Sequence, residues 1–316
     1  MNKFIFFILL IFLFILIFLI NGCNNQTTSS EIISRYDKIP IDTIKITPET
    51  DINPPKSYSL DYNNPVPVNG KLNSAGAEDS SFIMPDGNTI YFFFTPEVNI
   101  PVEKQILDGV TGIWVSKKIN GEFGEPERII LQDKNKLALD GCEFVENNVM
   151  LFCSAREGYS GINWFSALFN ENKNKWEFDK KVEFPEEWKV GELHEFNGEL
   201  YYHSEREGGK GGLDIWKITR NEKGEWQTPE NIESINTEKD EGWPALSPDG
   251  NELWLTKDYG LWRSKKINGE WQKPELIISP LAGEATIDNF GNVYFTHHFY
   301  KNDTMLEADI YVAYKK

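Results

Sequence analysis

Five acidic residues stand at matching places in five similar segments of the chain, and they are the first candidates for chemistry. Each opens a short stretch that reads as a hairpin, such as Glu-Gly-Trp-Pro-Ala in the fourth segment. The five are Glu78, Asp140, Glu192, Glu241 and Glu284. Carboxylates that converge on one place raise one another's pKa, or attract a cation or a polyhydroxylated ligand. The set therefore predicts either a ligand site or a repeated structural contact.

Residues that break the repeat indicate a more specific site. The stretch Glu192-Leu193-His194-Glu195 adds a histidine and a second acid, and Trp243 adds an aromatic face suited to sugar stacking. We expect a ligand site formed by Glu143, Glu192, His194, Glu195 and Trp243. A metal on His194 with Glu192 and Glu195 is not expected, because alternate strand positions point to opposite faces. The sequence has no zinc motif, nucleophile elbow or Cys/His pair, and we expect no metal, no cofactor and no assigned catalytic residue.

A repeated structural unit must position these residues, and the self-similarity of the sequence defines it. Ser116–Phe123 reads SKKINGEF and Ser264–Trp271 reads SKKINGEW, an offset of 148 residues (264 minus 116). Related turns precede Trp176 and Trp226, so the period is about 49 residues. The units contain short strands and turn residues, without a convincing amphipathic helix. A four-stranded unit repeated every 40–50 residues is typical of a β-propeller.

We predict an all-β fold, a single β-propeller over residues 58–316 with five four-stranded blades. The fifth unit ends at Lys316 after its third strand, whereas Ser59–Val68 precedes the first unit as a spare strand. We expect this N-terminal strand to complete the last blade and join the ends of the ring. The first strand of each propeller blade lines the central channel, so the five acids should gather at one mouth of it.

The N-terminus predicts the compartment. Lys3 precedes an unbroken apolar run, Phe4–Ile20, which is followed by Asn21-Gly22-Cys23. A cationic start and an apolar core are typical of a secretory signal. Residues 19–23 resemble a bacterial lipoprotein signal, which implies that residues 1–22 are the signal peptide and that Cys23 is lipidated. The alternative is an uncleaved anchor, because this run of 17 apolar residues is at the short limit for a span.

Both alternatives place the rest of the chain outside the cytoplasm, attached to a bacterial membrane on its periplasmic or cell-surface side. Residues 23–57 begin with a polar stretch without periodicity and then contain four prolines. Such a composition predicts a flexible tether that holds the folded part off the membrane.

The two remaining cysteines, Cys142 and Cys153, can pair. If Asn147-Asn148 is a two-residue hairpin turn, the cysteines face each other directly, with Cα atoms roughly 4.5–5.5 Å apart. An exported protein permits such a disulfide. The alternative is two buried thiols that act as small hydrophobic residues.

The repeats resemble a known family. Ser-Pro-Asp-Gly followed by a Leu-rich strand, within the longer segment 204–250, looks like the repeats of TolB-type (WD-repeat-like) propellers of the cell envelope. The resemblance covers roughly residues 70–316 and implies fold and compartment. It implies no catalytic residues, because such repeats serve scaffolding, binding and enzymatic proteins alike. The sequence departs from TolB in having five repeats where that protein has six blades, and in lacking its N-terminal domain.

The charge of the chain argues against a nucleic-acid partner. The sequence has 49 acidic and 32 basic residues, and the net charge of −17 repels a phosphate backbone. We expect an exported, lipid-anchored propeller that is a binding or scaffolding module for an envelope protein or glycan. The alternative is a glycoside hydrolase that uses the channel carboxylates, as five-bladed arabinanases and levansucrases do. Recurrence of the acids favours a structural role, whereas two acids about 5–9.5 Å apart in an open pocket would favour hydrolysis.

Overall fold

Short runs of β-branched and aromatic residues, separated by turn residues, favour strands over helices. In the computed structural model these runs form an all-β protein over the residues that the structure describes, 34–133 and 135–316. The part from Arg35 to Lys316 packs as one unit. The predicted signal peptide (1–22), the lipidation site Cys23 and the start of the predicted tether lie outside the described residues.

Most strands fall into successive antiparallel groups. The first group contains β3 (Ala77–Ile83), β4 (Thr89–Thr95), β5 (Gly112–Ile119) and β7 (Glu127–Arg128). The second contains β8 (Ala138–Glu146), β9 (Val149–Arg156), β10 (Ile162–Asn170) and β11 (Lys175–Val182). The third contains β12 (Leu193–Phe196), β13 (Glu199–Ser204), β14 (Asp214–Thr219) and β15 (Glu230–Asn231).

The C-terminal strands repeat the pattern. The fourth group contains β16 (Gly242–Leu246), β17 (Glu252–Lys257), β18 (Gly260–Ile267) and β20 (Glu275–Ser279), and the last contains β21 (Ala282–Ile287), β22 (Val293–Lys301) and β23 (Thr304–Ala313). Two short strands, β6 (Glu122–Phe123) and β19 (Glu270–Trp271), extend hairpins. Among the residues that the structure describes, the helical elements are η2 (Arg35–Lys38), α2 (Val102–Gln105) and η3 (Glu186–Trp188). Within the described residues, no helix has the length and apolar character required to cross a membrane.

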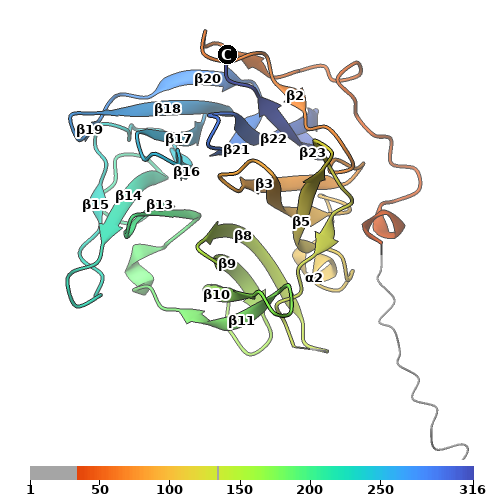
Figure 1. Cartoon of the computed structure of the whole chain (residues 1–316), viewed down its shortest axis with the longest axis horizontal. Coiled ribbons are helices and arrows are strands. Elements are labelled where there is room, and N and C mark those ends of the chain that lie inside the picture. The colour runs from red at the N-terminus through yellow and green to blue at the C-terminus, as the bar shows by residue number, and fades with distance from the viewer. Residues whose placement is uncertain (1–33, 134) are drawn as a thin grey trace, which may run out of the picture. The chain divides into compact units, whose positions relative to one another are not determined.

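The first strand of each group lies nearest the middle of the arrangement, and the later strands lie further out (Figure 1). β3 contacts β8, β8 contacts β12, β12 contacts β16, and β16 contacts β21, which in turn contacts β3. A parallel pair, Ala308 with Ala77, also links β23 to β3 within one sheet. The first strands thus surround a common axis, and the fold is propeller-like.

The N-terminal segment pairs with the C-terminal strand, as the spare strand in the sequence predicted. β2 (Val66–Pro67) lies antiparallel to β23, with Val66 opposite Val312. Val68 N–H donates to the Ile310 carbonyl at 3.1 Å, which extends the contact by one residue. A further strand, β1 (Lys56–Ser57), adds to the outer edge of β20.

Residues 35–57 were expected to belong to the flexible tether, but the structure places them against the sheets. The guanidinium of Arg35 is buried and pairs with Glu78 at 2.7 Å. Lys45 forms an ion pair with Glu307, and Asp51 lies 2.9 Å from Nε2 of His297. The partners of these contacts are buried residues of the sheets. The composition of residues 35–57 alone does not predict such partners.

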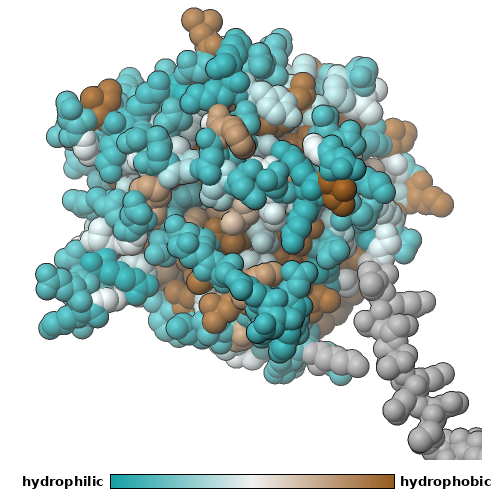
Figure 2. Space-filling model, in the orientation of Figure 1, coloured by the Kyte–Doolittle hydropathy of each residue, from teal (hydrophilic) through white to brown (hydrophobic). Residues whose placement is uncertain are grey.

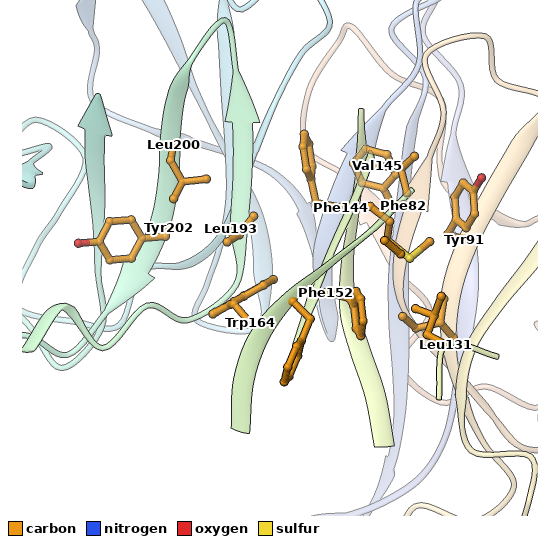
Figure 3. Close-up of a cluster of buried hydrophobic side chains, with 14 of the residues drawn as sticks. Phe82, Tyr91, Leu131, Phe144, Val145, Phe152, Trp164, Leu193, Leu200 and Tyr202 are labelled. Atoms are coloured by element: carbon orange, nitrogen blue, oxygen red, sulfur yellow. The ribbon is translucent and has the colours of Figure 1, made fainter. Parts of the chain in front are cut away.

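Hydrophobic side chains fill the space between adjacent sheets. Figure 3 shows one cluster in which Phe82 and Phe144 from two first strands meet Phe152 and Trp164 from the neighbouring strands, and each of these is at most 8% exposed. Burial of one such side chain stabilises the fold by about 1.5–3 kcal/mol. The face in Figure 2 is mainly hydrophilic with scattered hydrophobic residues, as the high charge of the chain predicts. The packing holds the first strands in fixed positions around the axis.

Cys142 and Cys153 form a disulfide, with Cα atoms 5.4 Å apart. The predicted register is wrong by one residue, because Cys153 lies opposite Gly141 and Cys142 is the extra residue of a β-bulge. The hairpin nevertheless begins in the predicted register, with Glu146 opposite Val149. The bulge therefore changes the pairing without separating the two sulfur atoms.

Candidate functional site in the axial cavity

A β-bulge in four of the first strands directs side chains toward the axis. The ladder is interrupted between Asp79 and Phe82, Gly141 and Phe144, Gly242 and Ala245, and Gly283 and Thr286. One residue of each bulge has a positive φ: Ser80 (48°), Cys142 (54°), Trp243 (53°) and Glu284 (57°). A bulge bends its strand and re-aims a side chain. All four of these residues line one cavity.

That axial cavity is small and acidic. Its volume is about 40 Å³, close to the space that one ordered water occupies. Its polar lining includes the carboxyls of Glu143, Glu192 and Glu284, together with His194 and the indole-bearing residue Trp243. Two backbone hydrogen bonds to β13 hold Glu192 at the cavity. The N–H of Gly191 donates to the His203 carbonyl at 3.0 Å, and the N–H of His203 donates to the Glu192 carbonyl at 3.2 Å. Carboxyl groups from three different sheets therefore converge on one point.

A wider cavity adjoins the axial one and forms its mouth. It has a volume of about 590 Å³ and shares Trp243 and Glu284 with the axial cavity. Tyr259 and Tyr300 lie on its wall, with ring centroids 6.4 Å apart. Aromatic faces beside carboxyl groups suit the apolar faces and hydroxyls of a sugar. A ligand of several heavy atoms has room in this mouth.

Burial raises the pKa of three axial carboxyls. Burial, with a further contribution from the charge of Asp79, raises the pKa of Glu192 to about 8. Burial also raises the pKa of Glu143 and that of Glu284 well above the ordinary range. Asp79 differs, because burial raises its pKa but the nearby His298 outweighs this effect and lowers it to about 2. At neutral pH the site therefore holds Glu192 as a carboxylic acid and Asp79 as a carboxylate.

The two histidines on β12 and β13 are neutral structural groups. Burial lowers the pKa of His194 to about 3 and that of His203 to about 4. The ring of His194 packs against Phe144, with centroids 4.8 Å apart. Nδ1 of His203 accepts a hydrogen bond from the N–H of Trp243 at 3.0 Å, which holds the bulge of β16.

The predicted ring of five acids divides into two sets. Glu78, Asp140 and Glu241 are buried and lie two positions before a bulge residue, whereas Glu192 and Glu284 face the axial cavity. The predicted equivalence is therefore wrong for Glu192 and Glu284. In both of their units a glycine directly precedes the acid. A bulge adds one residue to a strand, so an acid that looks equivalent in the sequence can point in a different direction.

The first set is structural. Glu78 accepts hydrogen bonds from N–H and Oγ of Ser74, four residues earlier, and Glu241 does the same with Thr237. Asp140 accepts from Oγ of Ser154. These donors come from the same unit or from the loop that leads into it. A cation completes each contact: Arg35, Arg156 and Lys257.

Four of the five predicted ligand-site residues lie together, since Glu143, Glu192, His194 and Trp243 all line the axial cavity. Glu195 does not, because it alternates with His194 along β12 and lines other surface hollows. Asp79 and His298 were not among the predicted site residues. Asp79 could have been found, since the corresponding position is glycine in the other four units.

Asp79, Glu284 and His298 form a cluster at the junction of the axial cavity and its mouth. One ligand atom from each lies within 4.8 Å of the other two. Nε2 of His298 is 3.4 Å from Oδ1 of Asp79. Two carboxyl oxygens and an imidazole nitrogen are a donor set that proteins use for divalent cations.

No family model and no curated protein matches the sequence. Among solved structures, the chain is similar to Zg3597, a family 117 glycoside hydrolase from Zobellia galactanivorans, with a TM-score of 0.50, 9% identity, and coverage of 83% of this chain and 90% of that one. It is also similar to an endo-arabinase from Bacteroides thetaiotaomicron, with a TM-score of 0.47, 13% identity and coverage of 76% and 95%. A structure assigned to TolB from Agrobacterium tumefaciens follows, with a TM-score of 0.40, 14% identity and coverage of 79% and 78%. At these identities the similarity supports a propeller fold and nothing more.

Proposed function

We propose that the protein is a five-bladed propeller whose N-terminal strand β2 completes the last blade. The pairing of Val66 with Val312 supports this closure. The contacts of the first strands, which run from β3 through β8, β12 and β16 to β21 and back to β3, support five blades. Neighbouring blades then enclose the axial cavity on every side.

We further propose that the protein is a carbohydrate-active enzyme, a glycoside hydrolase that acts at the axial cavity. The observation that carries this proposal is the convergence of Glu143, Glu192 and Glu284, from three sheets, beneath an open mouth. The structural acids of the repeat are bonded to cations, whereas these three carboxyls have no such partner among the residues that the structure describes. The family 117 glycoside hydrolase of similar fold is in keeping with this class of activity.

Glu192 is the candidate general acid. With a pKa of about 8 it is protonated at neutral pH, and a carboxylic acid of that kind can protonate the oxygen of a leaving sugar. Asp79 on the facing strand, whose pKa is about 2, would supply the opposing charge or hold the attacking water. Trp243 and Tyr259 in the mouth would bind the sugar through their aromatic faces.

The test is hydrolysis of a panel of aryl glycosides and polysaccharides, followed by release of chromophore or reducing sugar. Glu192→Gln should lower kcat/KM by about 100-fold or more, the usual contribution of a general acid. Glu195→Gln is the matched control, because it changes a carboxyl three residues further along the chain that lies outside the axial cavity. Equal activity of the wild type and Glu192→Gln would refute the assignment of the acid.

A binding module remains the second candidate, and one observation favours it. The axial cavity offers only about 40 Å³, whereas the mouth offers about 590 Å³ and carries the aromatic residues. A glycan could therefore bind in the mouth without reaching Glu192. Binding on a glycan array that is lost in Trp243→Ala, with no hydrolysis of any array member, would select this function.

We also propose that the protein is exported and lipid-anchored through Cys23 on the periplasmic or cell-surface side of a bacterial membrane. The apolar run before Asn21-Gly22-Cys23 supports this proposal. Mass spectrometry of the membrane-extracted protein should find a diacylated or triacylated N-terminal Cys23. An intact Met1 in the mature protein would contradict it.

A further inference from the structure

We propose that Asp79, Glu284 and His298 bind one divalent transition-metal cation at the junction of the axial cavity and its mouth. The proposal concerns the same cavity but does not rest on hydrolysis. The three ligand atoms lie within 4.8 Å of one another. Two ligand atoms bound tetrahedrally to a cation at about 2.1 Å are about 3.4 Å apart, the separation that His298 and Asp79 already have. The wider separations in the cluster would have to contract by up to about 1.4 Å.

The three ligands come from three strands whose positions are fixed independently. Asp79 lies in β3, Glu284 in the bulge of β21, and His298 in β22. The N–H of Glu284 donates to Oγ1 of Thr256 at 2.9 Å, which anchors the bulge from the neighbouring sheet. His298 already contacts Asp79 at 3.4 Å. The donor set is therefore assembled before any cation arrives.

Unpartnered buried oxygens supply an independent reason for a cation here. Glu143 is 6% exposed and lines the axial cavity, and neither of its carboxyl oxygens has a hydrogen-bond partner within the described part of the chain. Oε2 of Glu284 is likewise buried without a partner there. A buried polar group without a partner costs about 1–3 kcal/mol, and more when it is charged. A cation, with the water it carries, would satisfy both residues.

The acidic character of the site also favours a bound cation. No lysine or arginine lines the axial cavity among residues 34–133 and 135–316. Within the described part of the chain, the ion pair of Asp79 with His298 is the one basic contact of the axial carboxyls. Lys239 and Lys257 line the adjoining mouth, but they pair with Asp258 and Glu241. Buried carboxylates are normally paired or coordinate a metal. The structural acids of the same fold follow this rule with arginine and lysine.

The donor types select the class of cation. An imidazole nitrogen with two carboxylates suits Zn²⁺ or Mn²⁺, whereas Ca²⁺ and Mg²⁺ prefer oxygen ligands alone. The sulfur of Cys142 is held in a disulfide and offers no thiolate. Three protein ligands leave coordination positions that face the mouth, where water or a sugar hydroxyl can bind.

The experiment uses the full chain without a polyhistidine tag, treated with chelator and then titrated with Zn²⁺ or Mn²⁺ in a calorimeter. We expect one cation per chain and a higher thermal midpoint after binding. His298→Ala and Glu284→Gln should each weaken binding at least 10-fold. Glu195→Gln, which changes a carboxyl outside the cluster, and Glu192→Gln should retain it.

Each other outcome counts against the site. Absence of binding by both cations overturns the proposal, as does equal affinity in wild type, His298→Ala and Glu284→Gln. Circular dichroism shows that each variant is folded before its affinity is compared. Because Glu192→Gln removes the proposed acid and keeps the ligands, loss of hydrolysis and loss of cation binding are separate results.

Discussion

Replacement of Arg35 by methionine should destabilise the folded chain, because it removes half of a buried ion pair. Methionine keeps an unbranched apolar side chain and removes the guanidinium. Arg35 is 1% exposed and Glu78 is 0% exposed, and Nη1 donates to Oε1 of Glu78 at 2.7 Å. Loss of one partner from a buried pair costs about 3–5 kcal/mol, mainly because the other charge stays buried.

The remaining contacts place the expected loss near the lower end of that range. Glu78 keeps the N–H and Oγ of Ser74 as donors, which stabilise its charge after the substitution. The variant also loses the bond from Nη2 of Arg35 to the Lys71 carbonyl and the stacking of the guanidinium on Phe94. We therefore expect a loss of about 3 kcal/mol in the free energy of unfolding.

The loss should depend on pH. Burial raises the pKa of Glu78, and the charge of Arg35 opposes this rise. Without Arg35 the carboxyl takes up a proton more readily, and a protonated Glu78 is no longer an unpaired charge. The destabilisation should therefore be largest at high pH and shrink as the pH falls toward the raised pKa of Glu78.

Urea unfolding at pH 8 and pH 6 measures these effects in Arg35→Met and in the double variant Arg35→Met/Glu78→Gln. The exposed neighbour Lys38 provides the control Lys38→Met, which should change stability by less than about 0.5 kcal/mol. The double variant should lose less than Arg35→Met, because no charge is left buried. A loss below about 1 kcal/mol in Arg35→Met would refute the docking of residues 35–38, since exposed pairs contribute that little.

Three further outcomes are expected. Deletion of residues 58–68 removes β2 and should abolish cooperative unfolding, and an unchanged melting transition would contradict closure by this strand. Burial lowers the pKa of His203 to about 4, so the unfolded chain binds a proton near pH 6.5 that the folded chain does not. Stability should fall as the pH drops from 6.5 toward 4, and His203→Asn should flatten this dependence in thermal melts. Trp243→Ala should weaken glycan binding by removing an aromatic wall of the mouth, with the array signal as readout.

The propeller-like fold could be predicted from the sequence because the signals for strands and turns lie within each repeated unit. The repeated turn sequences and apolar runs define strands locally, and the spare segment 59–68 predicts a partner for the last strand. The docking of Arg35 and Lys45 could not be predicted, because their partners Glu78 and Glu307 are distant in the chain and belong to no repeated pattern.

The site was predicted in part for a related reason. Glu143, Glu192, His194 and Trp243 depart from the repeat, and departures are visible in a single sequence. Their grouping with Glu284 depends on bulges, which shift the direction of a side chain by one residue without a clear sequence mark. His298 was missed because its partner Asp79 lies on another strand more than 200 residues away, a proximity that only closure of the sheets creates.

A lipid on Cys23 would hold the sheets close to a membrane, because Arg35, Lys45 and Asp51 are docked on them. If Cys23 carries the lipid, only the 11 residues 24–34 separate the anchor from the first docked residue. An extended chain spans at most about 3.6 Å per residue, so the segment 24–34 is no longer than about 40 Å. A tether free to residue 57 would allow roughly three times that span. With a lipid on Cys23, the sheets would stay within about 40 Å of the bilayer, and a glycan or protein partner would have to reach them there.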